Sequence, residues 1–334
     1  MNHSCEDIYI IAEINTSHFG NIDLAKELIV SAKAAGADCV KFQSWSERSL
    51  YSKSFFQENP IAHRFIKKFS LSEAQLKELA EFCLSIGIDF LSTPYSTEEA
   101  KFLVSQRASV GIKVASMDID NIPYLESIAS YNRRIFLSTG MATIEEIDHA
   151  VKALCKHGAD DIVLLHCVSQ YPTELRAANI NNVSMLKQRY PQLLVGYSDH
   201  TEGVEAAMAA IALGAEVIER HFTLDKTRIG MDNNMATEPK EFQYLVDRCR
   251  NTRVALGSYN RNLTVDDWTQ RRIMRRSLVY RHSFKKGHRL KIEDVLFKRP
   301  GSGLNISDLK MVLGRELAED VSEDTLIMLA DLKA

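Results

Sequence analysis

Short apolar segments alternate with amphipathic segments along the first part of this chain, and the pair occurs eight times. This repetition is typical of parallel β/α units, and eight units in about 250 residues match the size of a closed (β/α)8 barrel. A doubly wound sheet is the alternative, but its first turn is commonly rich in glycine, whereas the first turn here reads Asn-Thr-Ser-His-Phe-Gly. The sequence therefore predicts an α/β fold, a TIM barrel. The expected strands are Ile8–Ile14, Cys39–Gln43, Asp89–Leu91, Gly111–Ala115, Ile135–Leu137, Ile162–Cys167, Leu193–Gly196 and Glu216–Ile218.

The alternation stops after Gly257, and turn signals such as Pro300-Gly301 follow. We expect a barrel domain over residues 1–265, a linker over 266–281 and a small β-rich domain over 282–334. The basic stretch Arg271–Arg276 has no interleaved aromatic residues, which favours a solvated segment or a subunit contact over a nucleic-acid site. Residues 45–69 carry four phenylalanines and are expected to pack over the barrel mouth.

Composition excludes several classes of protein. The chain has 334 residues, of which 45% are hydrophobic, and a formal net charge of −3, so no bulk basicity points to nucleic acid or an anionic membrane. No run approaches the roughly 18 apolar residues of a membrane span, and the first residues lack a basic signal-peptide region. The six cysteines form no CxxC pair. We therefore expect buried free thiols and a cytoplasmic protein.

Polar and ionisable residues lie at or near the carboxyl ends of the expected strands. Catalytic groups of TIM barrels lie at the carboxyl ends of the strands. The sequence therefore predicts an active site there. The residues concerned are Glu13, Lys41, Gln43, Thr93, Lys113, Ser116, Asp118, Ser138, His166, Ser169, Tyr171, Ser198, His200 and His221.

Lys41 and Lys113 lie within otherwise apolar strands, where an unpaired ammonium group is costly. One interpretation is a phosphate cradle that the two lysines form with hydroxyl groups of Ser116, Ser138, Ser169 and Ser198. The alternative is that each lysine forms a salt bridge within the barrel, for example to Glu13.

His200 and His221 end adjacent expected strands. Two neutral imidazoles at a barrel mouth suit a divalent metal that keeps open positions for water or substrate. A hydrogen-bonded structural histidine, or an acid–base group, is the alternative for each of them.

Taken in order, the motifs resemble those of the sialic acid synthase family, and the resemblance covers essentially the whole chain. They are Ala12-Glu13-Ile14, Val40-Lys41-Phe42-Gln43, Ser92-Thr93-Pro94, Ile112-Lys113-Val114-Ala115-Ser116, Ser138-Thr139-Gly140-Met141, Leu165-His166-Cys167-Val168-Ser169-Gln170-Tyr171-Pro172, Gly196-Tyr197-Ser198-Asp199-His200-Thr201 and Ile218-Glu219-Arg220-His221-Phe222. The tail, with Lys298-Arg299-Pro300-Gly301, is similar to the family's C-terminal antifreeze-like (SAF) domain.

The resemblance implies condensation of phosphoenolpyruvate with an N-acylated hexosamine in its open aldehyde form, with release of phosphate. It implies a Mn2+ or Mg2+ ion on His200 and His221, and an acidic role for Glu13 beside the reacting carbon. It also implies a domain-swapped homodimer in which Arg299 of one chain reaches the partner's sugar. The positions implied to hold phosphoenolpyruvate are Lys41, Thr93, Lys113, Ser116, Ser138, Ser169 and Ser198, and those implied to face the sugar are Gln43, Asp118, Tyr171 and Asp232.

Two positions depart from the family pattern: Asn233 stands where many relatives have histidine, and Ser169 where some have asparagine. Both lie on the sugar side, so the identity of the acceptor stays open. Two other functions are weighed as well. One is an aldolase that uses Lys113 as a Schiff-base nucleophile, and the other is a barrel without catalytic activity in polysaccharide assembly.

Overall fold

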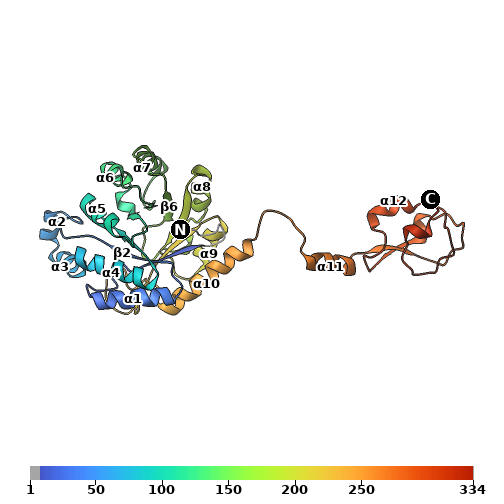
Figure 1. The fold of residues 1–334 in the computed structure, drawn as a ribbon, viewed down its shortest axis with the longest axis horizontal. Helices are drawn as coiled ribbons and strands as arrows, with labels where there is room; N and C mark the ends of the chain where they lie inside the picture. The colour runs from blue at the N-terminus through green and yellow to red at the C-terminus, as the bar shows by residue number, and fades with distance from the viewer. Residues whose placement is uncertain (1–7, 334) are drawn as a thin grey trace. The chain divides into compact units, whose positions relative to one another are not determined.

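The computed structural model describes residues 8–333. The chain divides into two compact units, one ending at Gly257 and the other beginning at Ser258. The first unit contains eight parallel strands and ten α-helices, and the second contains a two-stranded antiparallel sheet (Figure 1). No helix among residues 8–333 is long and apolar enough to cross a membrane.

The eight strands form one sheet that curls into a barrel. Their order is β3-β2-β1-β8-β7-β6-β5-β4, and all pairs are parallel. A parallel bridge from Phe90 in β3 to Ser109, just before β4, joins the two ends. This confirms the predicted TIM barrel. The strands are β1 (Tyr9–Glu13), β2 (Cys39–Gln43), β3 (Asp89–Thr93), β4 (Ile112–Val114), β5 (Ile135–Ser138), β6 (Ile162–Cys167), β7 (Leu194–Asp199) and β8 (Val217–His221).

Helices between the strands cover the outside of the barrel. Their ends follow local signals in the sequence: Ser72 and Gln75 form a capping box at the start of α4, and Gly87 ends that helix with φ 70°. Thr143 and Glu146 cap α7 in the same way. The helices are α1 (Ile22–Ala34), α2 (Lys53–Glu58), α3 (Pro60–Phe69), α4 (Glu73–Ile86), α5 (Thr97–Ser105), α6 (Ile122–Ala129), α7 (Ile144–Lys156), α8 (Asn181–Arg189), α9 (Glu205–Ala212) and α10 (Pro239–Leu256).

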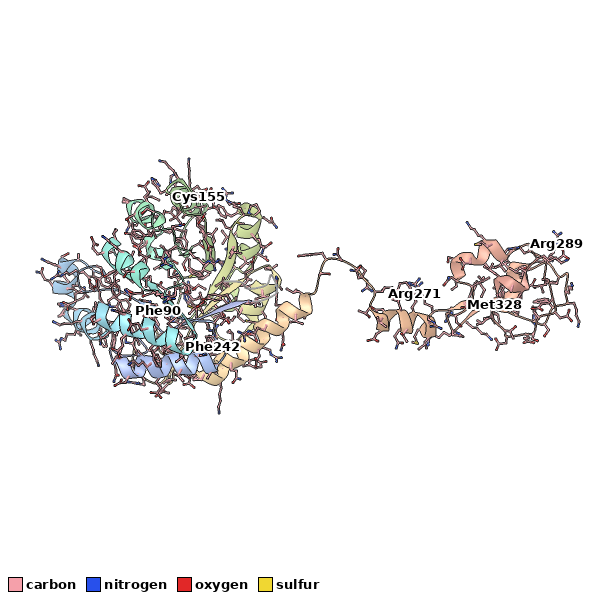
Figure 2. The ribbon with its side chains drawn as sticks, in the orientation of Figure 1. Phe90, Cys155, Phe242, Arg271, Arg289 and Met328 are labelled. Carbon is pink, nitrogen blue, oxygen red and sulfur yellow. The ribbon has the colours of Figure 1, made fainter. Side chains whose placement is uncertain are left out.

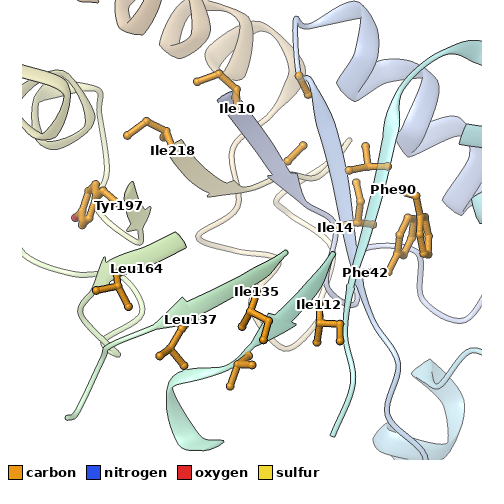
Figure 3. Packing of buried hydrophobic residues seen from close by; sticks show 14 of the residues in the cluster. Ile10, Ile14, Phe42, Phe90, Ile112, Ile135, Leu137, Leu164, Tyr197 and Ile218 are labelled. Carbon is orange, nitrogen blue, oxygen red and sulfur yellow. The ribbon is translucent and has the colours of Figure 1, made fainter. Parts of the chain in front are cut away.

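Two layers of apolar side chains hold the barrel together. Residues such as Ile10, Phe42 and Phe90 point outward and pack in the layer beneath the helices (Figure 3). Their strand neighbours, Ile11 and Leu91 among them, point inward and fill the lower part of the barrel. Because side chains alternate along a strand, the next inward positions fall at the carboxyl end of the barrel. Those positions carry polar groups.

The segment between β2 and β3 forms α2 and α3 in addition to α4. Its aromatic residues pack in a cluster of their own that includes Trp45, Phe56 and Phe69. The ring of Phe19, which lies in the loop after β1, contacts Phe69 at a centroid distance of 5.8 Å. The expected packing of residues 45–69 at the carboxyl end of the barrel is therefore observed.

The second unit has a small apolar core of its own that includes Leu278, Tyr280 and Ile327. It comprises α11 (Val265–Met274), β9 (Ser277–Tyr280), β10 (Val295–Lys298) and α12 (Leu309–Val312). The helix α11 begins at a capping box, Thr264 with Asp267. The range 266–281, expected as a linker, thus holds a helix and a strand of this unit. Arg271, Arg289 and Met328 mark it in Figure 2, and Phe90 and Phe242 mark the barrel core.

Candidate active site

A cavity of about 360 Å³ lies at the carboxyl ends of the barrel strands. Its volume is within the range of small-molecule sites. Three larger hollows, of about 900, 660 and 410 Å³, lie elsewhere on the barrel, but their walls contain neither of the two buried lysines. The cavity at the strand ends therefore carries the chemistry.

Most of the residues predicted from the strand ends line this one cavity. Two of the predicted residues, Asp118 and His166, do not. Asp118 is the last residue of the 3-10 turn Ser116–Asp118, from which Met117 lines the cavity. Burial raises the pKa of the Asp118 carboxyl group. His166 is also outside the wall, because it faces the helix layer and contacts the backbone oxygen of Ala178 at 2.7 Å. The predicted residues that do line the cavity are Glu13, Lys41, Gln43, Thr93, Lys113, Ser116, Ser138, Ser169, Tyr171, Ser198, His200, His221 and Asp232.

Lys41 sits between two carboxylates. Its Nζ lies 2.8 Å from Oε2 of Glu13 and 2.8 Å from Oε2 of Glu219, and all three side chains are buried. Burial lowers the pKa of Lys41 to about 7, against the opposing charge of Glu219. The salt-bridge alternative considered for the two lysines therefore applies to Lys41.

Lys113 is held differently. Its Nζ donates to Oγ of Ser138 at 2.6 Å and to the backbone oxygen of Val114 at 3.1 Å, and no carboxylate lies within salt-bridge distance among residues 8–333. Its side chain is buried, with 3% exposure. An ammonium group buried without a carboxylate partner is ready to receive an anion.

Hydroxyl groups gather beside Lys113 around Gly140. The Oγ of Ser116 accepts a hydrogen bond from the Gly140 N–H at 3.0 Å. A Cβ at Gly140 would lie 2.7 Å from that oxygen and 2.5 Å from Oγ of Ser169, too close for either to stay in place. The absence of a side chain at Gly140 thus allows hydroxyl groups from two loops to converge on one small space.

Glu219 is a site residue that the sequence reasoning missed. Besides its contact with Lys41, it accepts a hydrogen bond from Oγ of Ser198 at 2.8 Å. Burial alone would raise its pKa, but the positive charges of Lys41 and Lys113 hold that pKa below its usual range. Period-two alternation within β8 provides the signal that would have revealed it, since Glu219 shares a strand face with His221.

His200 and His221 lie side by side, with ring centroids 5.4 Å apart. The Nδ1 of His200 is 2.8 Å from the backbone oxygen of Val168. Since a carbonyl oxygen only accepts, Nδ1 carries a proton in this contact, which leaves Nε2 as the nitrogen that could face a metal ion. Burial lowers the pKa of His221 well below its usual value, and the charges of His200 and Lys41 add to this effect. His221 is therefore a neutral imidazole.

These two imidazoles fit a divalent cation that retains open positions. One has its Nδ1 fixed by a backbone oxygen, the arrangement that typically orients a metal-binding histidine. Residues 8–333 contain no group of three or more His, Cys, Asp or Glu side chains arranged to hold a metal ion. Water and substrate would have to complete the shell, as in catalytic rather than structural sites.

Cys167 and Tyr171 surround His200. Burial alone would raise the pKa of the Cys167 thiol, but His200 and Lys113 outweigh it and the net shift is downward. Burial alone would lower the pKa of His200, and contact with Cys167 reverses that shift. The ring of Tyr171 lies against His200 at a centroid distance of 4.2 Å.

The loop between β8 and α10 brings Asp232 to the cavity. Asn15, in the loop after β1, donates to the Asp232 carboxylate, and burial raises the pKa of that carboxyl group. Asn233 is buried outside the cavity, where it donates to the backbone oxygens of Asp225 (2.8 Å) and Arg228 (2.9 Å). Asn233, which stands where many relatives have histidine, therefore holds the backbone of this loop and does not line the cavity.

Arg299 belongs to the second unit, where it is exposed at the end of β10. Its neighbour Pro300 is anchored through its backbone oxygen, which accepts from Oγ of Ser277 at 2.7 Å. The contribution of Arg299 to a site stays a prediction.

Comparison with known proteins identifies the family. The sequence pattern of the NeuB family matches residues 28–261, and that of the SAF domain matches residues 275–333. The chain belongs to the NeuB family. This confirms the resemblance to sialic acid synthases, and the chain is an enzyme of the phosphoenolpyruvate-dependent transferase type.

Several relatives of the chain are named as synthases of nonulosonic acids. The chain is 37% identical over 329 residues to the N,N'-diacetyllegionaminic acid synthase of Campylobacter jejuni, with 95% of this chain and 98% of that protein covered. It is 31% identical over 355 residues to the N-acetylneuraminate-9-phosphate synthase of Drosophila melanogaster, with 97% of this chain and 95% of that protein covered. The crystal structure of N-acetylneuraminic acid synthetase from Leptospira borgpetersenii matches with a TM-score of 0.73 and 33% identity, over 80% of this chain and 91% of that one.

Proposed function

We propose that this enzyme condenses phosphoenolpyruvate with the open-chain aldehyde of an N-acylated hexosamine to form a nonulosonic acid. C3 of phosphoenolpyruvate attacks the aldehyde carbon, whose oxygen takes up a proton, and an oxocarbenium centre develops at C2. Water adds to C2 and gives up a proton. The C2–O bond to the phosphate then breaks, which releases phosphate and leaves a 2-keto acid.

The convergence of Lys113 and the hydroxyl groups around Gly140 on one buried space carries this proposal. Such a set of donors suits the phosphate of phosphoenolpyruvate, and it is already oriented before the substrate arrives. In the proposed mechanism Lys113 also stabilises the phosphate as it leaves, because the charge on its bridging oxygen grows as the C2–O bond breaks. Thr93, Ser138 and Ser169 add further hydroxyl groups to the cavity wall. Ser198 also lines the cavity, where its hydroxyl donates to Glu219.

The burial and contacts of Glu13 support an acid–base role for this residue. It is buried beside Lys41, and its Oε1 accepts from Nε2 of Gln43 at 3.3 Å. We assign to Glu13 the stabilisation of the cationic C2 centre and the acceptance of a proton from the attacking water. Lys41 forms ion pairs with Glu13 and Glu219, and its charge helps to lower the pKa of Glu219.

His200 and His221 would hold the divalent metal, Mn2+ or Mg2+. A bound cation of this kind polarises the aldehyde oxygen as a Lewis acid. Gln43, Tyr171 and Asp232 line the cavity and would contact the sugar.

The proposal includes a cytoplasmic homodimer in which the second units are exchanged. A unit of fewer than 80 residues buries little apolar surface by itself and gains stability by docking. Arg299 of one chain would then donate to the acyl group of the partner's substrate.

One assay tests the function: release of phosphate from phosphoenolpyruvate with Mn2+, measured across a panel of N-acyl hexosamines. We expect release that depends on both the acceptor and the metal, and His221→Ala should raise the Mn2+ concentration needed. Full activity after exhaustive chelation, with no metal found by elemental analysis, would exclude the metal. Borohydride reduction in the presence of substrate should leave Lys113 unmodified, whereas a stable adduct there would support the Schiff-base alternative.

A further inference from the structure

A buried ion pair lies next to His200 and His221 on the outer side of the barrel wall. Nη1 of Arg220 is 2.6 Å from Oδ2 of Asp199, and the two side chains are 6% and 0% exposed. Each member directly precedes a histidine, since His200 follows Asp199 and His221 follows Arg220. Because side chains alternate along an extended chain, the histidines line the cavity, whereas the ion pair is not part of its wall.

The ladder between β7 and β8 ends at this ion pair. Asp199 and Arg220 are the last residues of the two strands that pair with each other. His221 continues β8 and pairs with Glu13 of β1, whereas His200 lies beyond the end of β7. The register of β7 with β8 therefore does not extend to the two histidines, and the distance between their rings depends on side-chain contacts as well.

Asp199 holds the chain around His200. Its Oδ1 accepts hydrogen bonds from the backbone N–H of Thr201 at 2.8 Å and from Oγ1 of Thr201 at 2.7 Å. The contact of an aspartate oxygen with the N–H two residues further on is an Asx turn, and His200 is its central residue. The backbone oxygen of His200 also accepts from the N–H of Thr173 at 2.8 Å. The Asp199 carboxylate thus fixes the chain on both sides of His200.

Arg220 connects this turn to the backbone of His221. Nη1 of its guanidinium group binds Asp199, and its Nε donates to Oγ1 of Thr237 at 2.9 Å. The N–H of Thr237 donates to the backbone oxygen of His221 at 2.9 Å. Because a guanidinium group is planar and its donors keep a fixed geometry, it links the segment around His200 rigidly to the residue that is bonded to His221.

The stability of the barrel does not by itself account for a fully buried ion pair. Moving two charges out of water costs free energy that their attraction often does no more than return, and replacing such a pair by uncharged side chains is often neutral or stabilising. A buried pair can instead select one conformation among several. Here the segments that the pair connects carry the two imidazoles of one site, whose ring centroids are 5.4 Å apart.

We propose that Asp199 and Arg220 are positioning residues whose ion pair holds His200 and His221 in the arrangement that a divalent cation requires. Neither residue lines the cavity, so both act through the backbone of the two histidines. This inference rests on the proposed function, which assigns Mn2+ or Mg2+ to His200 and His221.

The test uses a double variant, Asp199→Asn with Arg220→Met, which removes both buried charges together. The asparagine can still accept from Thr201, whereas the methionine offers no donor to Thr237. Because no charge is left unpaired, we expect Tm to change by only a few degrees. The Kd for Mn2+, measured by isothermal titration calorimetry, should rise at least tenfold. The thermal shift that phosphoenolpyruvate produces in metal-free protein should stay unchanged, since its phosphate is assigned to Lys113.

Two further variants provide the comparison. Arg220→Lys keeps a charge for Asp199 but lacks the second donor, so its Kd for Mn2+ should rise at least threefold and stay below that of the double variant. Arg134 and Asp161 form a similar pair directly before β5 and β6, at the opposite end of the barrel, where Nε of Arg134 lies 2.9 and 2.8 Å from the two carboxylate oxygens. Arg134→Met with Asp161→Asn is therefore the matched control, and its affinity for Mn2+ should equal that of the wild type.

The outcomes separate this inference from the proposed function. Wild-type affinity for Mn2+ in the folded double variant would overturn the positioning role and leave the proposed function intact. An equal loss of affinity in the control at Arg134 and Asp161 would do the same, because general destabilisation would then explain both results. If the double variant does not fold, Arg220→Lys decides, and an unchanged Kd for Mn2+ in that variant would overturn the inference. Absence of Mn2+ binding by the wild type would instead reject the metal in the proposed function and, with it, the inference.

Discussion

Replacing Lys41 or Lys113 by methionine should show which of the two lysines stabilises the fold and which one binds an anion. The two side chains are equally buried, and both lie within strands of the barrel. Their partners differ: Lys41 contacts two carboxylates, whereas Lys113 contacts a hydroxyl group and a backbone oxygen. Methionine keeps most of the volume of either side chain and removes the ammonium group, with its charge and its hydrogen bonds.

The expected losses of stability follow from these partners. Lys41→Met leaves Glu13 and Glu219 buried without their cation, and breaking a buried ion pair costs about 3–5 kcal/mol. For a domain of this size the loss lowers Tm by roughly 2–4 °C per kcal/mol, or about 6–20 °C in all. Lys113→Met removes the hydrogen bond to Ser138, worth about 1 kcal/mol, and it also removes a charge buried without a carboxylate partner. Its Tm should fall by at most about 4 °C.

The affinity for phosphoenolpyruvate should change in the opposite order, with the greater loss in Lys113→Met. A charge-assisted hydrogen bond contributes about 1.5–3 kcal/mol, so Lys113→Met should weaken phosphoenolpyruvate roughly 10- to 150-fold. At a concentration of 100 Kd the ligand stabilises the wild type by about 2.7 kcal/mol. A hundredfold loss of affinity reduces this to about 0.4 kcal/mol. Thermal unfolding with and without phosphoenolpyruvate should therefore show a clear shift for the wild type and almost none for Lys113→Met.

A double variant provides the matched control. Lys41→Met with Glu219→Gln removes one of the two unpaired carboxylates, so it should recover part of the stability that Lys41→Met alone loses. Equal loss of stability in the two lysine variants would refute the distinction between them. Retention of the full ligand shift by Lys113→Met would remove Lys113 from the phosphate site.

Three further predictions concern other parts of the molecule. Gly140→Ala should raise the KM for phosphoenolpyruvate at least tenfold in steady-state assays, because its Cβ would displace the converging hydroxyl groups, and an unchanged KM would contradict the cradle. Arg299→Ala should raise the KM of the sugar and spare that of phosphoenolpyruvate, and mixing it with Lys113→Met chains should restore part of the activity; no recovery in verified heterodimers would argue against action across the dimer. Burial lowers the pKa of His18 to about 4, and its Nδ1 accepts from the Gly20 N–H at 3.0 Å. In the unfolded chain the pKa of a histidine is about 6.5, so the contribution of neutral His18 to stability is complete above that pH. As the pH falls to 4, the free energy of unfolding should decrease by about 3 kcal/mol because protonation favours the unfolded chain. Denaturation measured at a series of pH values should therefore show a different pH dependence of this free energy for wild type and His18→Asn only between about pH 6.5 and 4.

The sequence alone predicted the barrel and most of its mouth, because both depend on short-range periodicity. Alternation along β2 places Lys41 and Gln43 on one face, and parallel pairing brings that face next to Glu13 of β1. Any chain that closes this barrel must gather these residues at one end. The same reasoning would have found Glu219 if the expected last strand, Glu216–Ile218, had been continued to His221, where the structure ends it.

Tertiary packing decided the pairing of charges and the direction of loop side chains. Lys41 and Lys113 are alike in sequence context, but their partners differ. For Lys41, the neighbouring strand β1 supplies Glu13, and β8, the next strand beyond β1, supplies Glu219. For Lys113, the neighbouring strand β5 supplies Ser138. In the loops no periodicity fixes the direction of side chains, and Asp118 does not line the cavity as the sequence predicted. Sequence patterns determine the register of the strands. Contacts between strands that are distant in sequence form only once the barrel has closed. These contacts determine which buried charge remains available to bind an anion.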